Sequence, residues 1–113
     1  KSRGRGISLV NDINDVRYTE TVILQKYLKN PMLLDGYKFD LRIYVLVTSI
    51  TPLEAYIYKE GFARMSTSHF NLNPDDLKNN FIHLTNTSVQ KNSTNINHNS
   101  ADAIVGGTKI SLK

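Results

Sequence analysis

The stretch "DGYKFDLRIYVLVTS", residues 35–49, joins two kinds of strand pattern in one segment. Its second half is apolar and rich in β-branched residues, which is typical of a buried strand. Its first half carries a charge at every second position, at Lys38, Asp40 and Arg42. Side chains two positions apart in a strand share a face and stand about 6–7 Å from each other. We therefore expect these three charges to form one row.

The residues between the charges are Phe39, Leu41 and Ile43, and we expect them to point into a core. Two cations flanking one carboxylate suit a polyanion, because cations neutralise phosphate and a carboxylate holds a sugar hydroxyl. The alternative is a solvated strand face on which Asp40 only pairs with its neighbours, since exposed ion pairs are common.

The following sequence predicts an antiparallel meander of three strands, near residues 38–49, 54–59 and 62–66. Turn signals in "ITPLE" and at Glu60-Gly61 separate these strands. In a meander, Arg64 would lie beside or near the charged row and would extend its positive surface. The alternative is an ordinary surface arginine that follows a turn.

Other segments predict short helices and further strands. We expect a helical turn at residues 13–16, a buried strand at 21–28, a helix that begins at Pro74 behind an Asn73 N-cap, a short apolar strand at the start of residues 82–91, an Asn- and Ser-rich surface loop at 92–103 and a helix entered from "IVGGTKISLK". Asp75 and Asp76 suit the first turn of that helix better than they suit a metal site.

The composition of the chain excludes some kinds of site and function. The chain has 113 residues, enough for one small domain, and a net charge of +4. This charge fits a slightly basic soluble domain or a positive cleft for phosphate or an acidic partner. Cysteine is absent, which excludes disulfides and thiolate zinc sites, and the three histidines lack metal-ligand spacing. We expect no nucleic-acid partner, because aromatics do not alternate with cations, and no membrane span.

Two short motifs carry groups that suit a bound anion. "SRGRG" lacks the Walker A pattern, but its glycines would let backbone N–H groups approach phosphate, and Arg3 and Arg5 add charge. A flexible basic turn is the alternative. "HLTN" places Thr85 and Asn86 after an apolar run, where polar side chains either cap a turn or hydrogen-bond a ligand.

Four blocks of the sequence together resemble the tubulin tyrosine ligase-like family: "SRGRGI", "LQKYLKNPMLLDGYKFDLRIYVLVTS", "YIYKEGFARMST" and "HLTNTSVQK". The resemblance runs from Ser2 to Lys91 in the family's order. "GGTKISLK" is similar to the family's G-x-K-W-S-L stretch, although Ile110 stands where the family usually has Trp. The resemblance implies an α+β, ATP-grasp-like fold with a mainly antiparallel sheet and flanking helices, of which residues 1–113 form a partial domain.

The resemblance also implies roles for residues that match the family's motifs. The nucleotide-binding residues would be Arg3, Gly4, Gln25, Lys26, Tyr27, Leu28, Lys38, Asp40, Thr85 and Asn86. The amino-acid substrate would be held by Arg64, Ser88 and Lys109, and the catalytic cations would be Lys38, Arg42 and Arg64. The ligands of Mg²⁺ (an Asp, a Glu and an Asn in the family) are expected beyond residue 113, so no metal ligand is assigned within these residues.

The activity implied is an ATP-dependent ligase that adds glutamate to glutamate side chains of tubulin C-terminal tails through an acyl-phosphate. Free L-glutamate and the acidic tails of tubulin or microtubules would be its substrates and partners, in the cytoplasm, on the cytoskeleton and in the cilium or basal body. Glycine or tyrosine ligases of the same family, and an inactive microtubule-binding pseudoenzyme, are the alternatives.

The ends of the sequence carry no start or stop signal. The chain begins at Lys1 without a methionine and ends at Lys113 without a closing element. We expect a piece of a longer protein, incomplete at both ends and inactive by itself. A complete domain of 113 residues is the alternative.

Overall fold

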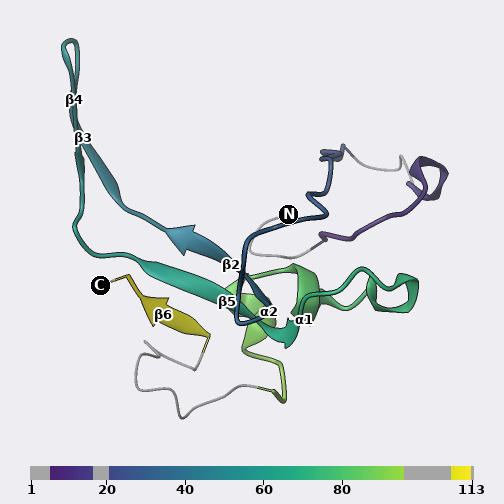
Figure 1. The fold of residues 1–113 in the computed structure, drawn as a ribbon. Coiled ribbons are helices and arrows are strands. Elements are labelled where there is room, and N and C mark those ends of the chain that lie inside the picture. Colours follow the sequence, from purple (N-terminus) through teal and green to yellow (C-terminus); the bar gives the residue numbers. More distant parts are fainter. Residues whose placement is uncertain (1–5, 17–20, 96–107, 113) are drawn as a thin grey trace.

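The computed structural model describes residues 6–16, 21–95 and 108–112. All strand pairs within this part of the chain are antiparallel, in a four-stranded sheet of order β1-β2-β5-β6 and a two-stranded sheet of β3 and β4 (Figure 1). The strands are β1 Leu33–Leu34, β2 Tyr37–Arg42, β3 Val45–Ile50, β4 Leu53–Ile57, β5 Phe62–His69 and β6 Lys109–Ser111. The helices are the 3-10 turns η1 Ile13–Asp15 and η2 Pro74–Asp76 and the α-helical turns α1 Asn80–His83 and α2 Thr87–Gln90. The prediction of a mainly antiparallel sheet is confirmed.

A tight hairpin brings β1 onto the edge of β2. Asp35 and Gly36 form its two-residue loop and have φ of 50° and 81°. Positive φ at both central positions is the geometry that follows the right-handed twist of paired strands, and Asp-Gly adopts it readily. The turn signal in the sequence is therefore confirmed, and it fixes the start of the strand that carries Lys38.

The decisive stretch at residues 35–49 forms two strands where one was predicted. β2 pairs with β5, and β3 pairs with β4, so residues 37–69 make one long hairpin with an irregular middle. Across this middle the Tyr58 N–H donates to the Tyr44 carbonyl at 2.9 Å. The predicted three-strand meander is wrong, because β5 pairs with β2 and does not lie beside β4.

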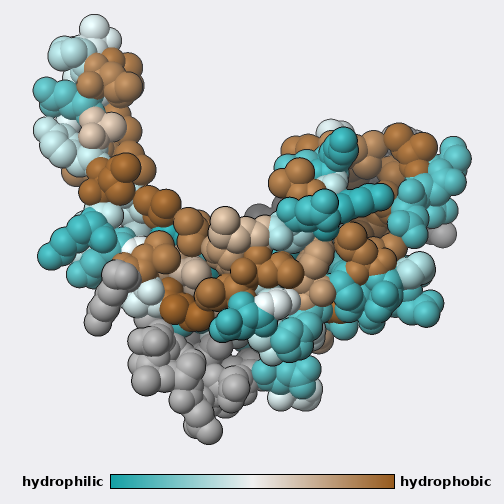
Figure 2. All heavy atoms as spheres, viewed as in Figure 1, coloured by the Kyte–Doolittle hydropathy of each residue, from teal (hydrophilic) through white to brown (hydrophobic). Residues whose placement is uncertain are grey.

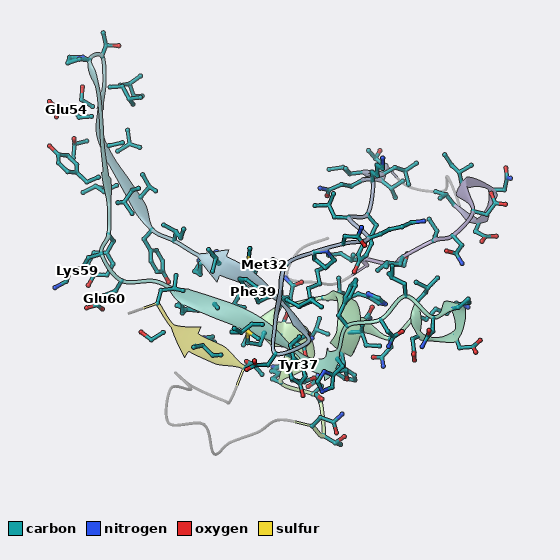
Figure 3. All side chains as sticks on the ribbon, in the orientation of Figure 1. Met32, Tyr37, Phe39, Glu54, Lys59 and Glu60 are labelled. Carbon is teal, nitrogen blue, oxygen red and sulfur yellow. The ribbon has the colours of Figure 1, made fainter. Side chains whose placement is uncertain are left out.

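The hairpin changes direction at this irregular middle, and β3 and β4 project away from the four-stranded sheet (Figure 1). Glu54 lies toward the tip of the projecting arm, and Lys59 and Glu60 lie at its base (Figure 3). Gly61 follows them, and a Cβ atom there would lie 2.6 Å from the Arg42 carbonyl oxygen. Only glycine allows β5 to approach the end of β2 this closely without a shift of the backbone.

Two predicted elements have a different structure. The strand expected at the start of residues 82–91 is wrong, because Asn79 caps a helical turn there: its side chain accepts a hydrogen bond from the Phe81 N–H at 3.0 Å. The helix expected to be entered from "IVGGTKISLK" is wrong too, because Lys109–Ser111 is strand β6, added to the edge of β5. η1 lies where a helical turn was predicted, whereas the helix predicted to begin at Pro74 is only the three-residue 3-10 turn η2. The "IVGG" stretch and most of the predicted Asn-rich loop lie outside the described residues.

The predicted buried strand at residues 21–28 is also wrong. These residues have no strand partner among those described, and Ile23 is 93% exposed. A β-branched run is stable as a strand only when a neighbouring edge takes its N–H and C=O groups. Within this run the side chain of Tyr27 is half-buried.

The buried apolar core of the described residues is small and lies between the sheet and α1. It consists of Ala63, Met65 and Ile82. Leu41 and Ile43, predicted as core residues, are 49% and 51% exposed, so that prediction is wrong for both, whereas Phe39 is half-buried. Apolar side chains are instead spread along the projecting hairpin, on a surface that faces solvent (Figure 2).

Candidate functional site

Three charged side chains lie in one row across adjacent strands of the four-stranded sheet. Asp40 in β2 is opposite Arg64 in β5, and Arg64 is opposite Lys109 in β6. Directly opposite residues in antiparallel strands have Cβ atoms about 4.5–5.5 Å apart and share a face. The sheet therefore brings together residues whose sequence positions differ widely, and this is the predicted neighbourhood of Arg64 and the charged row.

Asp40 and Arg64 form a two-pronged ion pair. The Arg64 Nε–H donates to Asp40 Oδ1 at 2.8 Å, and a terminal guanidinium nitrogen donates to Oδ2. This hydrogen bonding, helped by the charge of Asp40, raises the pKa of Arg64 further above its usual range. Two of the five guanidinium N–H groups are used in this pair, so the side chain is held in place with donors left for a second anion.

Lys109 supplies the second cation of the row. Its Nζ lies 5.0 Å from the ring centroid of Phe62, two residues before Arg64 in β5. A cation over an aromatic face is stabilised by the ring quadrupole, which holds the long side chain over the sheet. The row therefore presents a carboxylate, a guanidinium and an ammonium in that order.

Lys38 lies where three segments of the chain meet. Its Nζ donates to the His83 carbonyl at 2.9 Å and to Tyr27 Oη at 3.2 Å, and it lies 4.6 Å from the Tyr27 ring centroid. Burial lowers the pKa of Lys38, and the nearby charge of Asp40 opposes that shift. "KFD" and "HLTN" are thus joined directly, through a side chain of one motif and the backbone of the other.

His83 is buried, with 1% of its surface exposed, and both of its ring nitrogens have partners. Nδ1 lies 2.9 Å from Tyr27 Oη, and Nε2 lies 3.2 Å from the Asp76 carbonyl oxygen. Burial lowers the pKa of His83; the Asp76 carbonyl opposes this shift and the charge of Lys38 adds to it. The imidazole is therefore neutral at pH 7.

Gln90 fixes the turn that carries Thr85 and Asn86. It is fully buried and donates to the carbonyls of Phe81 and Leu84. Its Oε1 accepts hydrogen bonds from the Thr67 N–H at 2.9 Å and the Thr67 hydroxyl at 2.7 Å, which ties the turn to β5.

Thr85 and Asn86 are the residues of this turn that were predicted to bind a ligand. Asn86 is the N-cap residue of α2, but its side chain makes no capping hydrogen bond. Thr85 and Asn86 are both half-buried, and Ser88 lies in the exposed part of α2. The predicted assignment of Thr85 and Asn86 to a ligand is compatible with this geometry.

The remaining predicted site residues are Arg3, Gly4, Arg42 and the members of the hinge segment. Arg3 and Gly4 are outside the described residues. Arg42 is exposed at the end of β2, with its guanidinium carbon 5.7 Å from the ring centroid of Tyr44. In the predicted hinge segment, Tyr27 makes the contacts described above, whereas the exposed members are Gln25, Lys26 and Leu28.

Sequence reasoning missed two residues of the site. His83 lacks metal-ligand spacing, and its place inside "HLTN" is the signal in the sequence that points to it. Gln90 had no such signal, because its role depends on carbonyl groups that only the folded turn brings together. Within the described residues no three metal-ligating side chains come together, and no helix is long and apolar enough to cross a bilayer.

Comparison with known proteins identifies the family. The sequence model described as "Tubulin-tyrosine ligase family" matches residues 1–112, almost the whole chain. The chain belongs to the tubulin-tyrosine ligase family. The resemblance of its motifs to that family is thereby confirmed.

Three similar relatives are named as tubulin polyglutamylases or as a probable one. Tubulin polyglutamylase TTLL5 of Homo sapiens is 47% identical over 81% of this chain and 7% of its own length. Probable tubulin polyglutamylase TTLL2 of Homo sapiens is 49% identical over 80% of this chain and 15% of its own. Tubulin polyglutamylase TTLL6 of Mus musculus is 45% identical over 82% of this chain and 11% of its own. The chain thus spans less than a sixth of each of these relatives.

Proposed function

We propose that this chain is part of an ATP-dependent ligase that adds glutamate to glutamate side chains in the C-terminal tails of tubulin. The observation that carries the proposal is the row Asp40–Arg64–Lys109 beside Lys38, in a member of the tubulin-tyrosine ligase family whose similar relatives are named tubulin polyglutamylases. The row offers anion-binding groups at a spacing that suits small charged substrates.

In this proposal ATP is a substrate held between two motifs. Lys38 and Asp40 contact the nucleotide from the sheet, and Thr85 and Asn86 contact it from the turn that Gln90 fixes. Gln25, Lys26, Tyr27 and Leu28 receive the adenine, and the glycine loop with Arg3 and Gly4 covers the phosphates. The half-buried Lys38 ammonium supports a contact between Lys38 and the nucleotide phosphates. A partly desolvated cation attracts phosphate more strongly than an exposed one.

The amino acid would bind on the other side of Asp40. Arg64 and Lys109 lie side by side across β5 and β6, and both can pair with carboxylate oxygens. Free L-glutamate carries two carboxylates and an amine, which suits a row of two cations and one carboxylate. Ser88 would add a further contact.

The reaction needs no covalent enzyme nucleophile. A carboxylate oxygen of the acceptor tail attacks the γ-phosphorus of ATP, ADP leaves, and an acyl-phosphate forms. The amine of glutamate then attacks the acyl carbon, loses a proton and expels phosphate, which leaves an amide. Lys38, Arg42 and Arg64 would neutralise the charge that develops during phosphoryl transfer.

Mg²⁺ would be expected in such a reaction, but we assign no ligand for it here. The described residues bring no three metal-ligating side chains together. The acceptor would be the acidic tubulin tail, which suits a chain with a net charge of +4, and the enzyme would act on microtubules in the cytoplasm or the cilium.

A ligase assay on the full-length protein tests the proposal. Purified protein is incubated with ATP, microtubules and labelled glutamate, glycine or tyrosine, and label on tubulin is measured. ATP-dependent incorporation of glutamate is the expected result. Incorporation of glycine or tyrosine alone would overturn the proposed donor, and binding to microtubules without incorporation of any amino acid would instead identify a pseudoenzyme.

A further inference from the structure

A continuous series of hydrogen bonds links Lys38 to the segment before it and the turn after it. Tyr27 Oη lies 3.2 Å from Lys38 Nζ and 2.9 Å from His83 Nδ1. His83 Nε2 lies 3.2 Å from the Asp76 carbonyl oxygen. We call these groups, from Lys38 through Tyr27 and His83 to Asp76, the Tyr27–His83 relay. It joins β2, the 21–28 segment, α1 and η2.

Each hydrogen bond in the relay has one consistent direction. An ammonium can only donate, so Tyr27 Oη accepts from Lys38. The Tyr27 hydroxyl proton is then directed to His83 Nδ1. An imidazole that accepts at Nδ1 carries its proton on Nε2, and this proton is donated to the Asp76 carbonyl, which can only accept. The arrangement requires neutral His83, in agreement with its lowered pKa.

The relay determines the direction in which Lys38 can bind a ligand. An ammonium has three N–H groups in a tetrahedral arrangement. One points to the His83 carbonyl and a second to Tyr27 Oη, so the direction of the third is set by the other two. Without Tyr27 and His83 in place, the ammonium could rotate about its last bond, and the third N–H would lose its direction.

We propose that His83, acting through Tyr27, is a positioning residue that aims the third N–H of the Lys38 ammonium at an oxygen of the bound nucleotide. This inference rests on the proposed function, in which Lys38 contacts ATP. It adds a task for a buried histidine and a tyrosine hydroxyl that the reaction itself does not use.

A purely structural role for His83 has to be separated from this one. Its ring also packs edge-on against Tyr27 and Phe70, at centroid distances of 5.7 and 6.1 Å. A change that alters this packing would lower stability and affect all substrates alike. A change that removes only the relay would alter ATP binding and leave the amino acid unaffected.

The test uses the full-length protein with Tyr27→Phe, His83→Phe, the double variant and His83→Asn. Binding of ATP is measured by calorimetry, and KM and kcat are measured for ATP and glutamate. Tyr27→Phe removes one half-buried oxygen and keeps the ring, and His83→Phe keeps a ring without either nitrogen. Asn at position 83 keeps an acceptor near the place of Nδ1.

We expect Tyr27→Phe and His83→Phe each to weaken ATP binding about tenfold, the loss expected for one hydrogen bond to a charged group. The KM for glutamate is expected to stay within about twofold. The double variant should bind ATP no more weakly than either single variant does, because each substitution alone already breaks the relay. His83→Asn should restore ATP binding to within about threefold of the unmodified protein.

The exposed His69 provides a matched control. Its ring stacks on that of Tyr37 with 4.2 Å between the ring centroids, and it lies on β5 outside the relay. His69→Asn should therefore leave ATP binding unchanged. Unchanged ATP binding in Tyr27→Phe, or additive losses in the double variant, would overturn the positioning role while leaving the proposed ligase intact. Failure of the unmodified protein to bind ATP would overturn the proposed function and this inference with it.

Discussion

The guanidinium of Arg64 and the ammonium of Lys38 both lie near Asp40, yet their surroundings suit them to different ligands. Arg64 is tied to Asp40 by two hydrogen bonds and lies next to Lys109. Lys38 is tied to Tyr27 and to the His83 carbonyl, next to the "HLTN" turn. Asp40 thus lies near two cationic groups, and under the proposed function each of them would contact a different substrate.

Substitution of each cation is expected to affect a different substrate in the full-length enzyme. Arg64→Ala should raise the KM for glutamate about tenfold or more, because the lost contact is a hydrogen bond to a charged group. Lys38→Ala should weaken ATP binding by a similar factor and change the KM for glutamate little. Steady-state kinetics with each substrate varied in turn measure both effects.

Arg64→Lys serves as the control for charge. Lysine keeps the positive charge but cannot make the two-pronged contact with Asp40. Most of the rise in the KM for glutamate should therefore persist in Arg64→Lys. If Arg64→Ala and Lys38→Ala each weaken the binding of both substrates equally, the assignment of the two cations to different substrates is incorrect.

The buried imidazole of His83 makes stability depend on pH. Its pKa lies below the ordinary 6.5, chiefly because of burial, with Tyr27, Lys38 and the Asp76 carbonyl as its polar neighbours. The unfolded chain therefore binds a proton at a higher pH than the folded one. The contribution of neutral His83 is complete above about pH 6.5 and is lost as the pH falls through the lower folded pKa.

Thermal unfolding between pH 7.5 and pH 5 tests this sign, with His83→Asn as the comparison. The unmodified protein should lose more stability on acidification than the variant does, since carboxylates that titrate in both cancel in the difference. Parallel pH profiles of stability for the two proteins would show that His83 does not make stability depend on pH in this way.

Strand β5 determines the site because it lies between the strands that carry the two other charged residues of the row. β2 on one side brings Asp40, and β6 on the other brings Lys109, which lies far away in the sequence. The start of β5 is set by Gly61, whose missing side chain leaves room for the Arg42 carbonyl. The same glycine accepts a hydrogen bond from the Leu112 N–H at 3.0 Å, just beyond β6.

Gly61→Ala is expected to loosen all three strands at this end. The added Cβ would meet the Arg42 carbonyl oxygen at 2.6 Å, so the backbone must shift. We expect the free energy of unfolding to fall by about 1–3 kcal/mol, as is usual for overpacking. The neighbouring exposed substitution Glu60→Ala should change it by less than about 0.5 kcal/mol. Chemical denaturation of both variants measures the difference, and equal effects would show that the close approach is unimportant.

Taken as a whole, the described molecule is extended. Its radius of gyration is 16.7 Å, compared with about 13 Å for a compact domain of this size. The arm of β3 and β4 and the segment at residues 21–28 extend from the sheet and expose large apolar side chains, among them Ile50 at 82% and Ile23 at 93% (Figures 1 and 2).

Residues 1–113 produced alone should therefore bind a hydrophobic dye strongly. Exposed apolar surface binds 8-anilinonaphthalene sulfonate, so we expect fluorescence well above that of a folded globular protein of equal mass. Ile50→Lys in the arm should lower the signal, whereas Lys59→Arg at its base should leave it unchanged. A signal at the level of a compact protein would contradict the exposure described here.

Local patterns predicted the features that depend on near neighbours. The Asp35-Gly36 turn follows from the preference of those residues for positive φ, and Asn73-Pro74 predicted the start of η2. The pattern failed where pairing partners decide the structure. Residues 21–28 have strong strand propensity but no edge to pair with, and Lys109–Ser111 forms a strand because the edge of β5 is available.

The sequence by itself determined the family, the alternation of charged and apolar residues in β2, and the tight turn before it, because each depends on residues close together in the chain. The fold alone determined that Asp40 faces Arg64 and Lys109, and that His83 and Gln90 are buried against other motifs. The physical reason is that strand register and the partners of buried polar groups depend on contacts between segments far apart in sequence, which no local pattern encodes.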